Sequence, residues 1–134
     1  MFFSSNANYP FVIAELSGNH NGKIENIFKL IDQAKICEVD AIKIQTYSPE
    51  TITLNSTNKD FLITKGPWAG KKLYDLYQEA HTPYEWHKDI FEYAKKKKIK
   101  IFSSPFSEFD ADFLDDLGCQ AFKIASFEVT HLPL

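Results

Sequence analysis

The sequence predicts an α/β protein built on a parallel sheet, and three observations support this fold class. Four short β-rich runs alternate along the chain with segments whose apolar residues recur at helical spacing. The stretches between the runs are long enough for helical crossovers, which join parallel strands with right-handed connections. The 134 residues have the composition of an ordinary globular domain, with 44% hydrophobic and 25% charged residues. The predicted element order is therefore β-α-β-α-β-α-β.

The first two predicted strands cover residues 11–15 and 40–46, with one amphipathic helix between them. The apolar stripe of that helix consists of Ile24, Ile27, Phe28, Ile31 and Ala34. Such a stripe has to be buried, and the sheet is the expected partner.

Residues 47–81 form an insertion after the second predicted strand. A short helix within it is predicted from Leu73, Leu76, Tyr77 and Ala80, and a loop is predicted at residues 66–68. Because the insertion follows the carboxyl end of a strand, we expect it on the face where α/β folds bind ligands. It is interpreted as a lid or a wall of a substrate site.

The next helix is marked by Thr82 as N-cap, Pro83 at the first helical position and Glu85 completing a capping box. Its predicted apolar face consists of Trp86, Ile90 and Ala94. The third predicted strand follows at residues 99–104.

The last predicted helix begins at Ser107, with Asp110 three residues later, and ends at Gly118, which suits a left-handed cap. Its predicted buried residues are Phe109, Phe113, Leu114 and Leu117. The fourth predicted strand covers residues 121–126.

Two architectures fit this order, an open doubly wound sheet and part of a (β/α)₈ barrel. A complete barrel takes about 250 residues and eight strands. Four strands alone would leave two unpaired edges and an apolar inner face. The sequence thus predicts an interrupted chain.

Composition excludes several classes of function. The formal charge is −3, and no basic face of the kind that binds nucleic acid is expected, since the basic run at residues 95–98 lies at a predicted helix end. The sequence contains no apolar run long enough to cross a membrane and no signal peptide, which predicts a cytoplasmic protein. Cys37 and Cys119 lack metal or redox spacing and are predicted to be reduced packing residues.

Lysines in two predicted strands point to a binding site for an anion. Ile42 and Ile44 share one face of their strand, so Lys43 and Gln45 share the other. Lys123 occupies a similar position in the fourth predicted strand. A buried lysine is costly unless an anion pairs with it, so the two lysines predict a strong anion site.

Two alternatives remain open for these lysines. One of them could form a Schiff base with a carbonyl substrate. Each could also pair with a carboxylate, Glu15 or Glu128, in a purely structural network.

Polar residues follow two other predicted strands. Glu15 precedes a polar turn at residues 17–22, which could present N–H groups to a ligand, and His20 is more often a loop residue than a metal ligand. Ser103 and Ser104 could hold an anion or cap the next helix, and no nucleophile elbow surrounds them. The sequence thus predicts an anion pocket at the carboxyl ends of the strands.

Four segments, residues 11–22, 40–47, 102–106 and 122–128, together resemble the sialic acid synthases. They read FVIAELSGNHNG, DAIKIQTY, FSSPF and FKIASFE, and lie in the order found in that family. Within the family, residues 66–77, 82–87 and 125–128 are more similar to the pseudaminic acid branch than to the N-acetylneuraminate branch.

The resemblance implies a (β/α)₈ barrel that condenses phosphoenolpyruvate with an open-chain amino sugar to give a nine-carbon 2-keto acid and phosphate. In the pseudaminic branch the sugar is a 2,4-diacetamido-2,4,6-trideoxy altrose. The implied phosphoenolpyruvate ligands are Lys43, Ser104, Lys123 and Ser126. Asn19, His20 and Gln45 complete the expected substrate site, and Glu15 and Glu128 would face the reacting carbons. Glu128 is the hypothesised general base.

The family also binds a divalent metal, manganese or magnesium, through two histidines expected beyond Leu134. Its C-terminal antifreeze-like domain is absent from this sequence, and full-length relatives are expected to be homodimers. The chain, residues 1–134, is therefore interpreted as the N-terminal half of the barrel, without turnover of its own. The alternatives are an N-acetylneuraminate synthase, a Schiff-base aldolase and a non-catalytic module that binds an anion or a protein partner.

Overall fold

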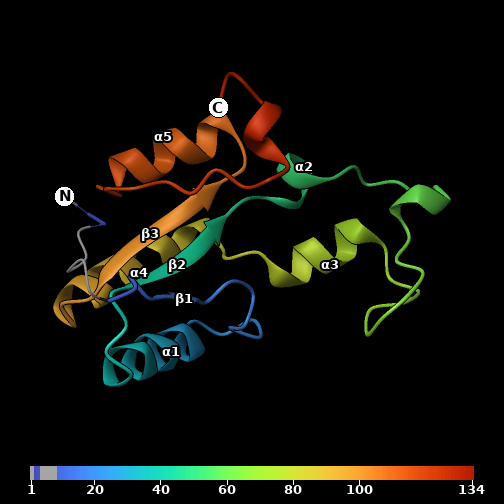
Figure 1. The fold of residues 1–134 in the computed structure, drawn as a ribbon. Helices are drawn as coiled ribbons and strands as arrows, with labels where there is room; N and C mark the ends of the chain where they lie inside the picture. Colours follow the sequence, from blue (N-terminus) through green and yellow to red (C-terminus); the bar gives the residue numbers. More distant parts are fainter. Residues whose placement is uncertain (1, 4–8) are drawn as a thin grey trace.

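The computed structural model describes residues 2–3 and 9–134, and their core is a three-stranded parallel sheet. The strands are β1 (Ile13–Glu15), β2 (Ala41–Thr46) and β3 (Lys100–Pro105), in the order β1-β2-β3. Glu15 pairs with Lys43, Lys43 with Phe102, and Gln45 with Ser104. All three carboxyl ends therefore lie at the same edge of the sheet (Figure 1).

Helices cover one face of this sheet. Figure 1 shows α4 (Tyr84–Lys96) behind the sheet, with α1 (Ile24–Ile36) beside β1 and α5 (Glu108–Asp116) beside β3. The apolar stripes of α1 and α4 bury the alternate strand residues in the main core cluster, which includes Ile27, Ile31, Ile42, Ile44, Ile90 and Ala94. Leu114 of α5 belongs to a second cluster, with Ala41, Phe102 and Cys119. Since side chains alternate along a strand, Lys43 and Gln45 project from the opposite face.

That opposite face is only partly covered. Near the amino ends of the strands, the rings of Phe2 and Phe3 pack edgewise on Phe102, at centroid distances of 5.6 and 5.3 Å. Lys100 Nζ donates to the carbonyl of Phe2 at 2.6 Å. Toward the carboxyl ends of the strands Glu15 is exposed, Lys43 is partly buried and Ser104 is buried.

The fourth predicted strand, at residues 121–126, is wrong for this structure. Only one parallel bridge forms there, between Ser103 and Phe122, with the Lys123 N–H donating to the Ser103 carbonyl at 3.0 Å. Among the described residues, this bridge and this hydrogen bond are the backbone links between the segment and β3, so no ladder extends it. The chain continues into the short 3₁₀ helix η2 (Glu128–Thr130).

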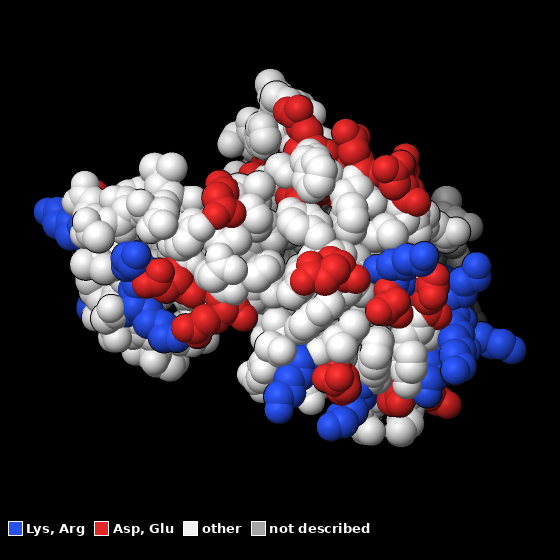
Figure 2. Space-filling model, turned by 180° about the vertical axis from the view of Figure 1, so that it is seen from behind, with Lys and Arg blue, Asp and Glu red and all other residues white. Residues whose placement is uncertain are grey.

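The insertion contains the helix that the sequence predicts, α3 (Leu73–Ala80). It also contains α2 (Pro49–Ile52) and η1 (Lys59–Phe61), and an antiparallel bridge joins Leu62 to Lys72. The segment leaves the carboxyl end of β2 and extends away from the sheet (Figure 1). In Figure 2 it stands out as a lobe beside the rest of the chain, and acidic and basic side chains are interspersed over this face.

Two predicted helix starts have different outcomes. Ser107 is the N-cap of α5 and its hydroxyl accepts from the Asp110 N–H at 3.1 Å, as predicted, while Gly118 takes a positive φ of 76° after the helix. The capping box at Thr82 is wrong, because Pro83 is the N-cap of α4 and no side chain caps that end. Phe109, predicted to be buried, is 65% exposed.

No helix in the described part of the chain has the length and apolar character needed to cross a membrane.

Candidate active site

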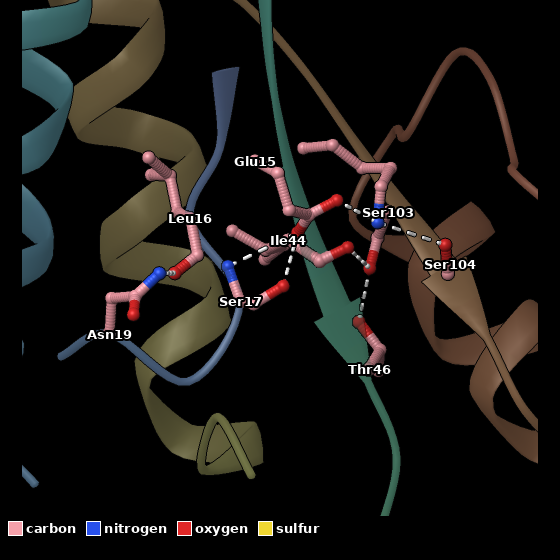
Figure 3. Close-up of polar contacts among 9 residues, drawn as sticks. Glu15, Leu16, Ser17, Asn19, Ile44, Thr46, Ser103 and Ser104 are labelled. Carbon is pink, nitrogen blue, oxygen red and sulfur yellow. Dashed lines mark hydrogen bonds and ion pairs between the residues drawn. The ribbon is translucent and has the colours of Figure 1, made fainter. Parts of the chain in front are cut away.

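The ends of β1, β2 and β3 bring Glu15, Lys43 and Ser104 into direct contact. Lys43 Nζ forms an ion pair with Glu15 Oε2 and donates to Ser104 Oγ at 3.3 Å. The other carboxylate oxygen of Glu15 accepts from the Ser17 hydroxyl at 2.6 Å and from the Ser17 N–H at 3.1 Å (Figure 3). The Lys43 side chain is 12% exposed and that of Glu15 is 41% exposed. The site is therefore a charge pair at the rim of the sheet, open on the Glu15 side.

Strand register places one more predicted residue on the same face. Gln45 pairs with Ser104, and Lys123 follows the isolated bridge between Ser103 and Phe122. Neighbouring residues of one row project to the same side of a parallel sheet, so Gln45 and Ser104 share the face of Lys43. The predicted placement of Lys123 on that face remains a prediction, because its segment is not a strand. The predicted burial of Lys123 is wrong, since that residue is exposed where its segment lacks a second strand neighbour among the described residues.

His20 lies in the turn after β1 and is buried, with both ring nitrogens engaged within the protein. Nδ1 accepts from the Gly22 N–H at 3.0 Å, and Nε2 lies 3.3 Å from the Ala80 carbonyl. Since a carbonyl can only accept, the ring carries its proton on Nε2. Burial lowers the pKa of His20, which favours the neutral ring. This geometry gives His20 a role in holding the insertion against the turn.

Asn19, in the same turn, is exposed and its amide nitrogen donates to the Leu16 carbonyl at 3.0 Å. Asn19 also lines a cavity of about 590 Å³ between this turn and the insertion, together with Gly18, Asn21, Gly22, Trp68, Leu76, Glu79 and Ala80. The insertion thus forms a wall beside the turn.

Ser126 and Glu128 lie beyond the sheet. Ser126 is exposed, and the Glu128 carboxylate, 14% exposed, is 4.0 Å from His131 Nδ1. In the described part of the chain, no hydrogen bond or ion pair joins Glu128 to Glu15 or Lys43. The structure therefore brings Glu15, Lys43 and Ser104 into contact, but it does not join Glu128 to them.

A buried polar cluster on the helix side of the same strand ends was not predicted. Thr46 Oγ1 lies 2.8 Å from His87 Nε2 and 2.7 Å from Ser103 Oγ, and none of the three side chains is exposed. Burial lowers the pKa of His87. The signal in the sequence was that Thr46 continues the inward face of Ile42 and Ile44 beyond the last apolar residue.

Within residues 2–3 and 9–134, no three His, Cys, Asp or Glu side chains gather closely enough to hold a metal ion. Both cysteines are free, as predicted, and burial raises the pKa of Cys119. Cys37 is exposed, so its predicted packing role is wrong.

With this geometry in view, comparison with known proteins identifies the family, because residues 30–134 match the NeuB family. The chain belongs to the NeuB family. It is 54% identical over 118 residues to the pseudaminic acid synthase of Campylobacter jejuni, covering 88% of this chain and 34% of that protein. It is 44% identical to the pseudaminic acid synthase of Helicobacter pylori, covering 93% of this chain and 37% of that protein. The predicted resemblance to sialic acid synthases is confirmed.

The solved structures of NeuB relatives identify the fold. The N-acetylneuraminic acid synthetase of Leptospira borgpetersenii, in a crystal structure with citrate, superposes with a TM-score of 0.76 at 28% identity. That superposition covers 94% of this chain and 40% of the synthetase. The three-stranded parallel sheet is therefore part of a (β/α)₈ barrel. The chain spans about a third of the length of the curated pseudaminic acid synthases that it matches.

Proposed function

We propose that this NeuB chain supplies the anion-binding part of a pseudaminic acid synthase. The reaction joins phosphoenolpyruvate to an open-chain 2,4-diacetamido-2,4,6-trideoxy altrose, giving the nine-carbon 2-keto acid and phosphate. The similarity to two pseudaminic acid synthases supports this reaction over that of an N-acetylneuraminate synthase. The cytoplasm is the proposed location, and a homodimer is the proposed state of the longer protein.

The contact between Lys43 and Ser104 is the observation that carries the proposal. It places an ammonium group and a hydroxyl on adjoining strands, 3.3 Å apart, on the sheet face away from α4, where the Lys43 side chain is 12% exposed and Ser104 is buried. Phosphoenolpyruvate is a small anion with a phosphate and a carboxylate, and charged hydrogen bonds in a site shielded from water bind such groups strongly. Gln45 pairs with Ser104 and extends the same surface, and Lys123 is the proposed second cation of the site.

The ion pair between Lys43 and Glu15 supports a catalytic role for Glu15. In the proposed reaction, carbon 3 of phosphoenolpyruvate attacks the sugar aldehyde, water adds to carbon 2, and the resulting tetrahedral intermediate expels phosphate. Glu15 adjoins Lys43 and would stabilise positive charge at carbon 2. Glu128 remains the proposed base for the proton of the attacking water, with Ser126 beside it as a ligand of the substrate.

A divalent manganese or magnesium ion is proposed for the longer protein. The described residues do not offer it a site, so no step above depends on it.

A chimera tests the proposed reaction. Residues 1–134 would replace the matching segment of the Campylobacter jejuni pseudaminic acid synthase, and phosphate and 2-keto acid would be measured with both substrates. We expect equal amounts of the two products, formed only when the amino sugar is present. A folded chimera that releases phosphate without the sugar, or that makes no 2-keto acid, would overturn the proposal.

Two lysines provide matched variants in this chimera. Lys43→Met should raise the KM for phosphoenolpyruvate about 30-fold, because a charged hydrogen bond contributes about 2 kcal/mol. Lys100→Met should leave this KM unchanged, since Lys100 lies on the same sheet face at the amino end of β3. Borohydride added with a keto acid should modify neither Lys43 nor Lys123, and reduction onto either lysine would support the Schiff-base aldolase instead.

A further inference from the structure

A buried polar chain lies behind the strand ends that carry the proposed site, on the side of α4. It runs from Ser103 through Thr46 and His87 to the Pro83 carbonyl, which is 3.0 Å from His87 Nδ1. Ser103 Oγ also lies 3.2 Å from the Ile44 carbonyl. The proposed reaction uses none of these groups directly. Their hydrogen bonds join β2 and β3 to α4.

The donors and acceptors of this hydrogen-bond network can be assigned. The Pro83 carbonyl can only accept, so His87 carries its proton on Nδ1 and Nε2 is an acceptor in the neutral ring. The Thr46 hydroxyl therefore donates to His87, and the Ser103 hydroxyl donates to Thr46 at the short distance of 2.7 Å. The Thr46 proton has one acceptor, His87 Nε2, and the Ser103 proton is shared between Thr46 Oγ1 and the Ile44 carbonyl, so both hydroxyls are held by buried partners.

The sequence neighbours of Thr46 and Ser103 belong to the proposed phosphoenolpyruvate site. Thr46 follows Gln45, and Ser103 precedes Ser104, which accepts from Lys43. Because adjacent strand residues point to opposite faces, fixing one residue also fixes the direction of its neighbour. We infer that His87 is a positioning residue, which holds the ends of β2 and β3 through Thr46 and Ser103 so that Gln45 and Ser104 meet phosphoenolpyruvate. This inference depends on the proposed function for its substrate.

A role in folding alone would give a different result. Loss of stability lowers the fraction of active protein and hence the apparent kcat, but leaves the KM of the remaining folded molecules unchanged. Misplaced binding groups raise the KM for phosphoenolpyruvate specifically. The two substrates provide the contrast, since the KM for the amino sugar should not change in either case.

The test uses isosteric and conservative variants in the chimera described above. Thr46→Val keeps the shape of the side chain but loses the hydroxyl, and should raise the KM for phosphoenolpyruvate about tenfold through displacement of the site. Thr46→Ser keeps the hydroxyl and should restore the KM to within about twofold of the parent. His87→Gln places an acceptor near the position of Nε2 and should behave like Thr46→Ser, whereas His87→Leu should behave like Thr46→Val.

A second measurement does not depend on activity. In the 134-residue chain labelled with ¹⁵N-histidine, the His87 ring should show the neutral tautomer protonated at Nδ1, assigned by its disappearance in His87→Gln. Thr46→Val should shift the Nε2 resonance, because its hydrogen bond is lost. An Nε2-protonated tautomer, or an unchanged KM in folded Thr46→Val, would overturn the inference.

The two proposals fail in separate ways. If the parent chimera makes no 2-keto acid, the proposed function fails, and the direct binding of phosphoenolpyruvate to the parent and Thr46→Val then tests His87. Equal affinity of the two proteins for phosphoenolpyruvate would overturn the positioning role.

Discussion

Glu15 and Lys43 form a charge pair that a bound anion must share. The Lys43 ammonium already contacts a carboxylate, so phosphoenolpyruvate would bring its negative groups close to Glu15. Like charges at such distances repel, and this repulsion weakens binding of the ground state. We therefore expect Glu15 to weaken the binding of phosphoenolpyruvate while it promotes the reaction, and one substitution can test both effects.

Glu15→Gln in the chimera should lower the KM for phosphoenolpyruvate about threefold, because the repulsion is removed. It should also lower kcat about 100-fold, since the carboxylate is proposed to stabilise the transition state. Steady-state kinetics with varied phosphoenolpyruvate would measure both. Ser17→Ala is the control, because it removes a hydrogen bond to Glu15 and leaves the charge in place. A KM that rises in Glu15→Gln would contradict the expectation.

Two buried histidines should make the stability of the chain depend on pH. Burial lowers the pKa of His20 and of His87 from the ordinary value of 6.5, so the unfolded chain binds more protons than the folded one. Stability should therefore rise with pH through this range, be complete above about 6.5, and fall as the pH drops below it. The pKa of Asp32, lowered by its hydrogen bond with Lys97, acts only near and below 3.8.

Urea unfolding at pH 7.5 and 5.5 would test this dependence, with a lower unfolding free energy expected at 5.5. His87→Gln should reduce the difference, because one of the two titrating rings is removed. A free energy that is equal at both pH values, or higher at 5.5, would show that these rings do not titrate as their burial indicates.

At the scale of residues, alternation along a strand predicted more than burial did. Lys43 and Gln45 face away from Ile42 and Ile44, as the sequence pattern indicated. The exposure of Lys123 could not be read from its own segment, because burial there depends on which strands lie on either side. The hydrogen bonds beyond His87 Nε2 also depend on Thr46 and Ser103, which lie 41 and 16 positions from His87 in the sequence.

At the scale of elements, the turn after β1 and the end of α3 are in close contact. A Cβ atom on Gly18 would lie 2.8 Å from the Ala80 carbonyl oxygen and 2.9 Å from the Ala80 Cβ. Only glycine permits this approach, which also brings His20 Nε2 to the Ala80 carbonyl. The insertion is thus anchored to the first strand and its turn.

Gly18→Ala should destabilise the chain by about 1–3 kcal/mol, the usual cost of overpacking a tight contact. The change would be measured by urea unfolding at pH 7.5. The double variant Gly18→Ala with Ala80→Gly should recover part of the loss, because one of the two close contacts is removed while the carbonyl contact remains. No loss in Gly18→Ala would mean that the turn and α3 separate freely.

Local chemistry predicted some helix ends and not others. Ser107 caps α5 because its hydroxyl reaches the Asp110 N–H, an interaction within four residues that the sequence contains in full. The start of α4 instead follows Pro83, and buried Thr82 does not act as its cap. The strand predicted at residues 121–126 depends on pairing along the edge of β3, which forms at one bridge only and which no local pattern could supply.

At the scale of the whole molecule, the last described segment leaves large apolar side chains in solvent. They include Phe122, Ile124, Phe127, Val129 and Leu132, of which Phe127 is 80% and Leu132 is 91% exposed. Large apolar side chains left in water in this way favour association. The barrel fold was predicted from the alternation of elements and the resemblance, but how far this surface is covered depends on segments outside the described sheet.

The 134-residue chain should therefore self-associate at micromolar concentrations, which sedimentation velocity over a concentration series would show. Phe127→Ser with Leu132→Ser should weaken association at least about tenfold, because a fully buried large apolar side chain contributes about 1.5 kcal/mol or more. Ile36→Ser is the control, since Ile36 is also a large exposed apolar residue, at 70%, but lies at the end of α1. A monomer at every concentration would contradict this expectation.

The contact between Gly18 and Ala80 also limits how the substrate preference of such a chain can be re-engineered. Exchanging residues 47–81 for the corresponding loop of another synthase would import a new residue at position 80 against an unchanged glycine. A donor loop with a larger residue there would push on the turn that follows Glu15 and disturb the chemistry before any new sugar could be tested. Loop grafts should therefore transfer positions 18 and 80 as a pair.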